Sequence, residues 1–166
     1  MDTPTLAAAP TEDHARTEPI RRILLGTDLS AVSDRAADHA IGLANEHGAE
    51  LVVLTVVDSN GFRLPGGRFV KRVDQERARA EGAAQMLVAR ARAAGVRATF
   101  LVWEGDPVES IVAASAAEHV DLVVLGTHGR GRLGRLVLGS ISARVSGQAA
   151  CQVVVVPAGP GSPEGD

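Results

Sequence analysis

The alternation of short apolar runs with helical segments most constrains what this chain can fold into. Runs rich in Val, Leu and Ile occur at 20–26, 50–58, 96–105, 121–127 and 151–157. ELVVLTVVD and CQVVVVP are apolar at almost every position, which is typical of strands covered by helices on both faces. Strands of this kind between helices predict an α/β fold with an open parallel sheet.

The segments between these runs have the periodicity of helices. Helices are expected at about 30–48, 70–94 and 106–120, and from Ser140 onward. In the first, alanines recur at a spacing that places them on one face. Ser30 or Ser33 is expected to cap its start and Gly48 to end it. The sequence DPVE, which begins at Asp106, combines a capping residue with Pro at the first helical position.

The order of these segments predicts a single domain over 20–157. Residues 1–19 and 158–166 are rich in Pro and acids or in Pro and Gly and lack any period, so both are expected to be disordered tails. In an open α/β sheet, ligands bind at the carboxyl ends of the strands. Candidate site residues therefore follow the strands, at 26–28, 58 and 104–106 and in the loop at 126–140.

Charge and composition exclude several classes of function. The net charge of −3 argues against a surface that binds nucleic acid or anionic lipid as a whole. The single cysteine excludes an internal disulfide, no apolar run approaches a membrane span, and the acidic N-terminus is unlike a signal peptide. We therefore expect a cytoplasmic protein with no nucleic-acid or membrane partner. Aromatic residues make up only 2% of the chain, so a planar ligand is expected to lie between aliphatic side chains.

The loop at 126–140, GTHGRGRLGRLVLGS, suggests a phosphate site and allows several interpretations. Its GRGRLG, which begins at Gly129, has the G-x-G-x-x-G spacing of a dinucleotide-binding turn. That turn belongs after the first strand and needs an acid about 20 residues later. Here no acid follows Asp121 until Glu164, which weakens the dinucleotide interpretation.

Two other interpretations of the loop have less support. A P-loop requires Lys and then Ser or Thr after its second glycine, but these positions hold Arg135 and Leu136. Nucleic-acid binding favours basic residues interleaved with aromatic ones, and Arg130, Arg132 and Arg135 have no aromatic neighbour within the loop. A solvated basic loop without a ligand stays open as an alternative.

A different grouping of the same glycines gives a coherent chemistry. Gly126 and Gly129 let the backbone turn sharply and approach a ligand closely. Gly139 and Ser140 come at the start of the last helix. We expect Ser140 to cap that helix and the free N–H groups at 140–142 to form an anion site. The intervening arginines would neutralise phosphates.

This grouping, G-x-x-G followed by nine residues and then G-S, resembles the signature of the ATP-binding universal stress proteins. The resemblance extends to ILLGTDLS, VVLTVVD, EGDPVESIV, DLVVLGTHGRG and CQVVVVP, and covers nearly all of the chain between Ile20 and Pro157. It implies a Rossmann-like parallel sheet of strand order 3-2-1-4-5 with helices on both faces.

The resemblance also implies bound ATP, with Mg²⁺, and assigns the contacts. Asp28 would lie at the nucleotide and join the phosphates in holding the metal, and the backbone at Val56 would contact adenine. The residues implied at the site are Gly26, Thr27, Asp28, Val56, Leu125, Gly126, Thr127, His128, Gly129, Arg130, Gly131, Gly139, Ser140, Ile141 and Ser142. Gly26 departs from the family, in which many members carry proline, so a looser turn is expected there.

The family further implies a homodimer that pairs through the last strand, 152–156. An unpaired apolar edge invites aggregation, and VVVV at this edge fits such pairing. The implied function is a stress-response or signalling module, dimeric and occupied by nucleotide, with protein partners that the sequence does not identify.

Catalytic groups are sparse in the sequence. There is no G-x-S-x-G and no His/Cys ligand set, so we expect a weak ATPase activity at most. His128 is expected to be a solvated loop residue and Cys151 a core residue. A slow ATP hydrolase or other nucleotide-dependent enzyme of related fold is one alternative function, and a nucleotide-free structural dimer is another.

Overall fold

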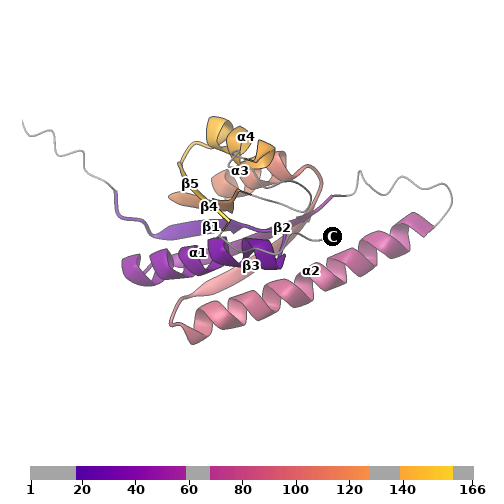
Figure 1. Ribbon diagram of the computed structural model, residues 1–166, viewed down its shortest axis with the longest axis horizontal. Helices are drawn as coiled ribbons and strands as arrows, with labels where there is room; N and C mark the ends of the chain where they lie inside the picture. The colour runs from indigo at the N-terminus through magenta and orange to yellow at the C-terminus, as the bar shows by residue number, and fades with distance from the viewer. Residues whose placement is uncertain (1–17, 59–67, 128–138, 159–166) are drawn as a thin grey trace, which may run out of the picture.

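A parallel sheet of five strands in the order β3-β2-β1-β4-β5 lies at the centre of the molecule (Figure 1). The structure is a computed structural model that describes residues 18–58, 68–127 and 139–158. The strands are β1 (Arg22–Gly26), β2 (Glu50–Val57), β3 (Ala98–Glu104), β4 (Leu122–Gly126) and β5 (Gln152–Val156). The predicted fold class and strand order are confirmed.

Helices cover both faces of this sheet. They are α1 (Asp34–His47), α2 (Arg68–Ala93), α3 (Pro107–Ala117) and α4 (Ser140–Gln148), with a 3₁₀ turn, η1 (Ala31–Ser33), before α1. One core cluster joins α1 and α2 to one face, and a second joins α3 and α4 to the other. Each face is therefore sealed by a pair of helices, as the uniformly apolar strands require.

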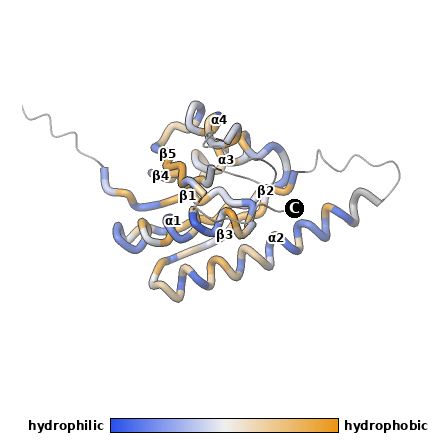
Figure 2. Tube along the Cα trace, in the orientation of Figure 1, coloured by the Kyte–Doolittle hydropathy of each residue, from blue (hydrophilic) through white to orange (hydrophobic). Residues whose placement is uncertain are grey.

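Small and branched aliphatic side chains build the two core clusters. Ile23, Leu24 and Leu25 of β1 are fully buried, and burial of each contributes about 1.5–3 kcal/mol. The alanines of α1 lie against the sheet with almost no exposure, which lets this helix approach closely. Hydropathy along α2 alternates between hydrophobic and hydrophilic residues, as expected for a helix with one solvent face (Figure 2).

Charged groups hold together the amino ends of the strands. The Arg22 guanidinium donates to Glu50 Oε2 at 2.8 Å and to the Glu118 carbonyl at 2.9 Å. Asp121 Oδ2 accepts from the backbone N–H groups of Arg21 and Arg22 at 2.8 and 3.0 Å. The hydrogen bond to Glu50 raises the pKa of Arg22. The charged side chains at the amino ends of the strands are thus engaged with one another and with the backbone.

Two of the expected helix ends are confirmed. The Glu109 N–H donates to Asp106 Oδ1 at 2.9 Å, so Asp106 caps α3 with Pro107 directly after it. Gly48 ends α1 with a φ of 63°. Asp is a preferred residue at a helix N-cap, and Gly is the residue that most easily adopts the positive φ at a helix end.

Other expected helix caps were wrong. Ser33 stands at the start of α1 but makes no side-chain cap, because its hydroxyl oxygen accepts from Thr27 Oγ1 at 2.9 Å while its O–H donates to the Ser30 carbonyl at 2.7 Å. Ser30 likewise makes no side-chain cap to η1. The cap of α4 is Gly139, and Ser140 is the first helical residue.

Several boundaries also differ from the expected ones. β1 begins at Arg22 rather than at residue 20, and β3 begins at Ala98 rather than at 96. α2 begins earlier than expected, at Arg68, and β5 begins at Gln152, one residue after Cys151. The predicted tails lie almost entirely outside the described residues, as do residues 128–138 of the glycine-rich loop.

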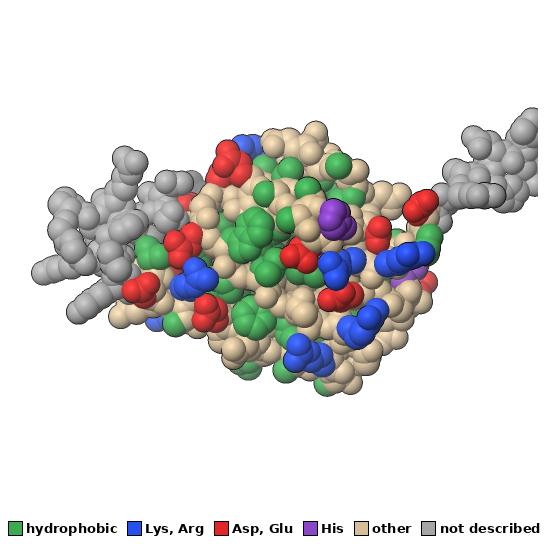
Figure 3. All heavy atoms as spheres, turned by 180° about the vertical axis from the view of Figure 1, so that it is seen from behind, with side chains coloured by type: hydrophobic (Ala, Val, Ile, Leu, Met, Phe, Trp, Pro, Cys, Tyr) green, Lys and Arg blue, Asp and Glu red, His purple; other side chains and the backbone are tan. Residues whose placement is uncertain are grey.

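The surface in Figure 3 carries charges of both signs around a group of hydrophobic side chains near its middle. Lys and Arg are interspersed with Asp and Glu on this face. The visible face therefore lacks the one-signed patch that binds nucleic acid. None of the helices in the described ranges is both long and apolar enough to cross a membrane.

His119 occupies a backbone conformation that favours glycine, and its replacement by glycine is expected to stabilise the fold. Its φ is 51°, and the bonds Val120 N–H to Ser115 O and His119 N–H to Ala116 O close the end of α3. We expect His119→Gly to raise the free energy of unfolding by about 1 kcal/mol, measured by chemical denaturation. Gly48→Ala, at a φ of 63°, should lower it by a similar amount. A destabilised His119→Gly would contradict this account.

Candidate functional site

The carboxyl edge of the sheet is staggered. The last pair between β1 and β2 is Gly26 with Leu54, whereas β2 and β3 stay paired as far as Val57 with Glu104. At about 3.3 Å per residue, β2 and β3 rise about 10 Å beyond the end of β1. We call this rise, formed by 55–57 and 102–104, the step.

Gly26 ends β1 beside the step, and a side chain there would require Leu125 to shift. A Cβ at Gly26 would lie 2.5 Å from Leu125 Cδ2 and 3.3 Å from Ile111 Cδ1. Leu125 therefore leans over the position where the family often carries proline. The looser turn expected at Gly26 stays a prediction; the structure shows that Leu125 and Ile111 lie close to the position that a Cβ would take.

The turn after β1 is tied down by hydrogen bonds. Thr27 Oγ1 accepts from the Leu29 N–H at 3.0 Å and donates to Ser33 Oγ at 2.9 Å. Asp28 Oδ1 accepts from the Ser30 N–H at 3.0 Å and from Ser30 Oγ at 2.6 Å. Leu29 has a φ of 60°, a strained conformation for a branched residue that persists only where its surroundings enforce it.

The second carboxylate oxygen of Asp28 has no such partner. Asp28 Oδ2 is buried and makes no hydrogen bond within the described residues. A buried carboxylate oxygen of this kind is costly unless a donor or a cation faces it. Among the described residues, the turn therefore supplies donors to one oxygen of Asp28 and none to the other.

Thr127 and Gly139 join the end of β4 to the start of α4. The Thr127 N–H donates to the Val156 carbonyl at 3.0 Å, and Thr127 Oγ1 accepts from the Ala158 N–H at 3.2 Å. A Cβ at Gly139 would overlap with the carbonyl oxygen of Thr127. Glycine is needed at 139 for this close approach and not for its φ, which is −53°.

The start of α4 has backbone donors that no carbonyl within the helix can accept. The first helical bond runs from the Ala143 N–H to the Gly139 carbonyl at 3.0 Å, so the N–H groups at 140–142 have no partner within the helix. The Ser142 hydroxyl, 2% exposed, donates to the same carbonyl at 3.0 Å. Ile141 is half-exposed.

The fold brings several of the implied site residues to one edge. β1 and β4 are neighbours, with Gly26 level with Leu125, so Asp28 and Thr127 follow adjacent strands, and Gly139 contacts the latter. Val56 lies on the step, on the other side of β1. His128, Gly129, Arg130 and Gly131 lie outside the described residues, so their expected roles stay predictions.

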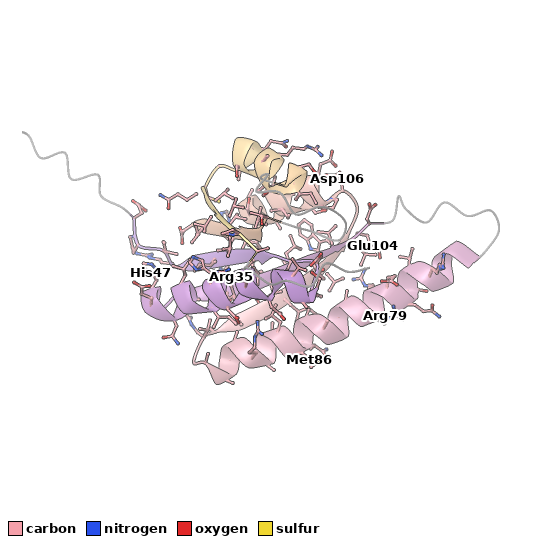
Figure 4. All side chains as sticks on the ribbon, viewed as in Figure 1. Arg35, His47, Arg79, Met86, Glu104 and Asp106 are labelled. Carbon is pink, nitrogen blue, oxygen red and sulfur yellow. The ribbon has the colours of Figure 1, made fainter. Side chains whose placement is uncertain are left out.

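The charged groups near this edge set limits on its chemistry. Among the described residues, no group of three or more His, Cys, Asp or Glu side chains is placed to hold a metal. Glu104 and Asp106 flank the junction of β3 and α3 (Figure 4). Glu104 Oε1 accepts from Arg77 at 3.0 Å, a bond that helps raise the pKa of Arg77. Asp28 is the carboxylate directly after β1, and its Oδ2 has no hydrogen-bond partner in the described ranges.

Cys151 lies away from this edge, just before β5. It is a free thiol, half-buried against the core under α3 and α4. Burial raises the pKa of Cys151, so the thiol stays protonated at neutral pH and reacts slowly. This agrees with the expected packing role.

A groove of about 440 Å³ lies between α1 and β5. Arg35, Asp38 and His39 of α1 line one side, and Val154–Val156 of β5 lie opposite; Arg35 is labelled in Figure 4. The sequence predicted an exposed edge at β5 but not the contribution of α1, because no periodic signal relates two elements so far apart in the chain.

The match to a family model decides what kind of protein this is. The model of the universal stress protein family matches residues 19–157. The chain belongs to the universal stress protein family. It is 36% identical over 138 residues to a universal stress protein of Methanocaldococcus jannaschii, which covers 82% of this chain and 81% of that protein.

Solved structures of the family have the same fold. The universal stress protein UspA from Lactobacillus plantarum superposes with a TM-score of 0.76 at 26% identity, over 84% of this chain and 99% of that one. A universal stress protein in complex with cAMP superposes with a TM-score of 0.65 at 25% identity, over 84% of this chain and 98% of that one.

Proposed function

We propose that this universal stress protein binds ATP at the carboxyl edge, between the step and the start of α4. The close approach of Gly139 to the Thr127 carbonyl carries the proposal, because it holds the first N–H groups of α4, which have no partner within the helix, against the end of β4. Such groups bind phosphate. A family relative solved with cAMP supports an adenine nucleotide as the ligand.

Asp28 suits a magnesium ion that arrives with the phosphates. Magnesium is usually held by one or two carboxylates together with substrate phosphates and water. Asp28 lies in the turn after β1, the strand next to β4, and offers one buried oxygen that has no hydrogen-bond partner among the described residues. The ion would neutralise charge between this carboxylate and the phosphates.

The proposed role is that of a binding module whose occupancy biases contacts with partner proteins. Copurified ligand provides the first test: denaturation of the purified protein should release adenine nucleotide, identified by mass spectrometry. Calorimetry with ATP and Mg²⁺ should show saturable binding. If neither ligand release nor binding is observed, the proposal fails and the nucleotide-free structural dimer takes its place.

Single-turnover hydrolysis separates the module from a slow hydrolase. Asp28 is the group that would support such a reaction, through the metal. The proposal expects a rate near background. A rate well above background that Asp28→Ala abolishes would assign an enzyme instead.

We further propose that two copies pair through β5. Val153, Val154 and Val155 are only partly buried, at one edge of the sheet (Figure 1). Such an edge readily pairs with another chain, and the groove beside α1 would lie along the same interface.

Val155→Lys is expected to convert the dimer into a monomer. Val155 belongs to neither core cluster, so the lysine leaves the fold intact while charging the edge, a device that blocks strand pairing. Light scattering coupled to size-exclusion chromatography measures the mass. Thr99→Lys, which charges the opposite edge strand β3, is the matched control and should stay dimeric. Equal behaviour of the two variants would argue against pairing through β5.

A further inference from the structure

Trp103 lies on the step next to the residue expected to contact adenine. In the parallel pair of β2 and β3, Val56 is level with Trp103. Both side chains pack on the sheet face that α3 and α4 cover, and parallel neighbours at the same level are about 4.8 Å apart. The indole and the Val56 side chain therefore form one continuous apolar surface.

This surface stands beyond the end of β1. Leu54, two residues before Val56, is the last residue of β2 that pairs with β1. Leu54 itself is 1% exposed, whereas Val56 and Trp103 are only partly buried. Val56 and Trp103 thus form an incompletely covered apolar wall at the carboxyl edge of the sheet, on the face that α3 and α4 cover.

The distance between this wall and the start of α4 is one that a nucleotide can span. β3 and β4 are separated by β2 and β1, so Trp103 is about 14 Å across the sheet from the end of β4. A nucleotide whose phosphates lie at the start of α4 can extend its base back across β1 toward the step. Asp28, after β1, lies between the two.

We propose that Trp103 is a positioning residue, whose indole forms the wall against which the nucleotide base packs. This inference rests on the proposed nucleotide site. It departs from the expectation that a planar ligand lies only between aliphatic side chains, because the register places the single tryptophan of the chain at the step. Stacking on an aromatic ring contributes to binding for any base, and its loss removes that part of the affinity.

The chain contains one Trp and no Tyr, so tryptophan fluorescence reports on this position alone. The test titrates the full-length protein with ATP and with inorganic tripolyphosphate, which carries the phosphates without a base. Calorimetry gives the affinity and fluorescence gives the environment of the indole. The variants are Trp103→Val and Phe100→Val, the latter on the same strand but packed on the opposite sheet face.

ATP should change the fluorescence of the wild type, and tripolyphosphate should not. Trp103→Val should weaken ATP binding about tenfold while leaving tripolyphosphate binding unchanged, and Phe100→Val should alter neither. Thermal unfolding of both variants shows that they fold. If ATP binds but Trp103→Val retains full affinity, the inference fails and the proposed function stands. If ATP does not bind the wild type, both fail.

Discussion

Gly139→Ala is expected to weaken ATP binding by about a hundredfold or more. The added Cβ meets the carbonyl oxygen of Thr127, which is backbone and cannot rotate away, so the start of α4 must move off the end of β4. This displacement takes the N–H groups out of hydrogen-bonding range of the phosphates, and the loss of two bonds to a charged group, at about 1.5 kcal/mol each, lowers the affinity about a hundredfold. The same overlap should lower the free energy of unfolding by about 1–3 kcal/mol.

Gly147→Ala is the matched control in the same helix. A Cβ at Gly147 meets nothing within 4 Å, and alanine is the better helix former by about 1 kcal/mol. Calorimetry should give wild-type affinity for this variant, and chemical denaturation should show equal or greater stability. If Gly139→Ala binds ATP as the wild type does, the contact between α4 and β4 does not build the site.

Asp28→Asn is expected to bind ATP more weakly than the wild type in the presence of magnesium and more tightly in its absence. Asparagine keeps an oxygen for the two bonds from Ser30, so the turn is preserved. With Mg²⁺ present, the loss of a charged ligand should weaken binding about tenfold. With the metal chelated, the variant should bind ATP more tightly than the wild type, because a carboxylate no longer repels the phosphates.

Calorimetric titrations with Mg²⁺ and with a chelator, on both proteins, measure this crossover. Asp38→Asn removes one negative charge from an exposed position on α1, where Asp38 pairs with Arg90 at 3.2 Å, and should leave both titrations as in the wild type. Parallel losses for Asp28→Asn in both conditions would show that Asp28 acts through the turn alone.

The sequence was sufficient to predict the layers of the fold. A strand that is apolar at nearly every position, such as β2, must be buried on both faces. Its sequence alone therefore predicts a sheet with helices on both sides. Asp106 was predicted correctly because cap, proline and acid agree at one place. Ser33 and Ser140 were not, because a serine hydroxyl can bond several nearby backbone groups, and the local turn decides which.

The site was less accessible from sequence, because it depends on how far each strand runs. The glycine spacing pointed to Gly139, and the structure supplies the reason in the Thr127 carbonyl. The level of Trp103 with Val56 could not be predicted, since register between strands is set by packing across the whole sheet. The same holds for Leu125 over Gly26.

Thr127 gives the proposed function a thermodynamic consequence. Its carbonyl lies against Gly139 at the proposed phosphate site, while its N–H bonds the Val156 carbonyl and its hydroxyl oxygen accepts from the Ala158 N–H at the end of β5. The proposed ATP site and the proposed pairing of two copies through β5 then share Thr127. If ATP shifts Thr127 and so strengthens pairing through β5 by some factor, linkage requires that pairing tighten ATP by that same factor. Nucleotide affinity would then rise with protein concentration.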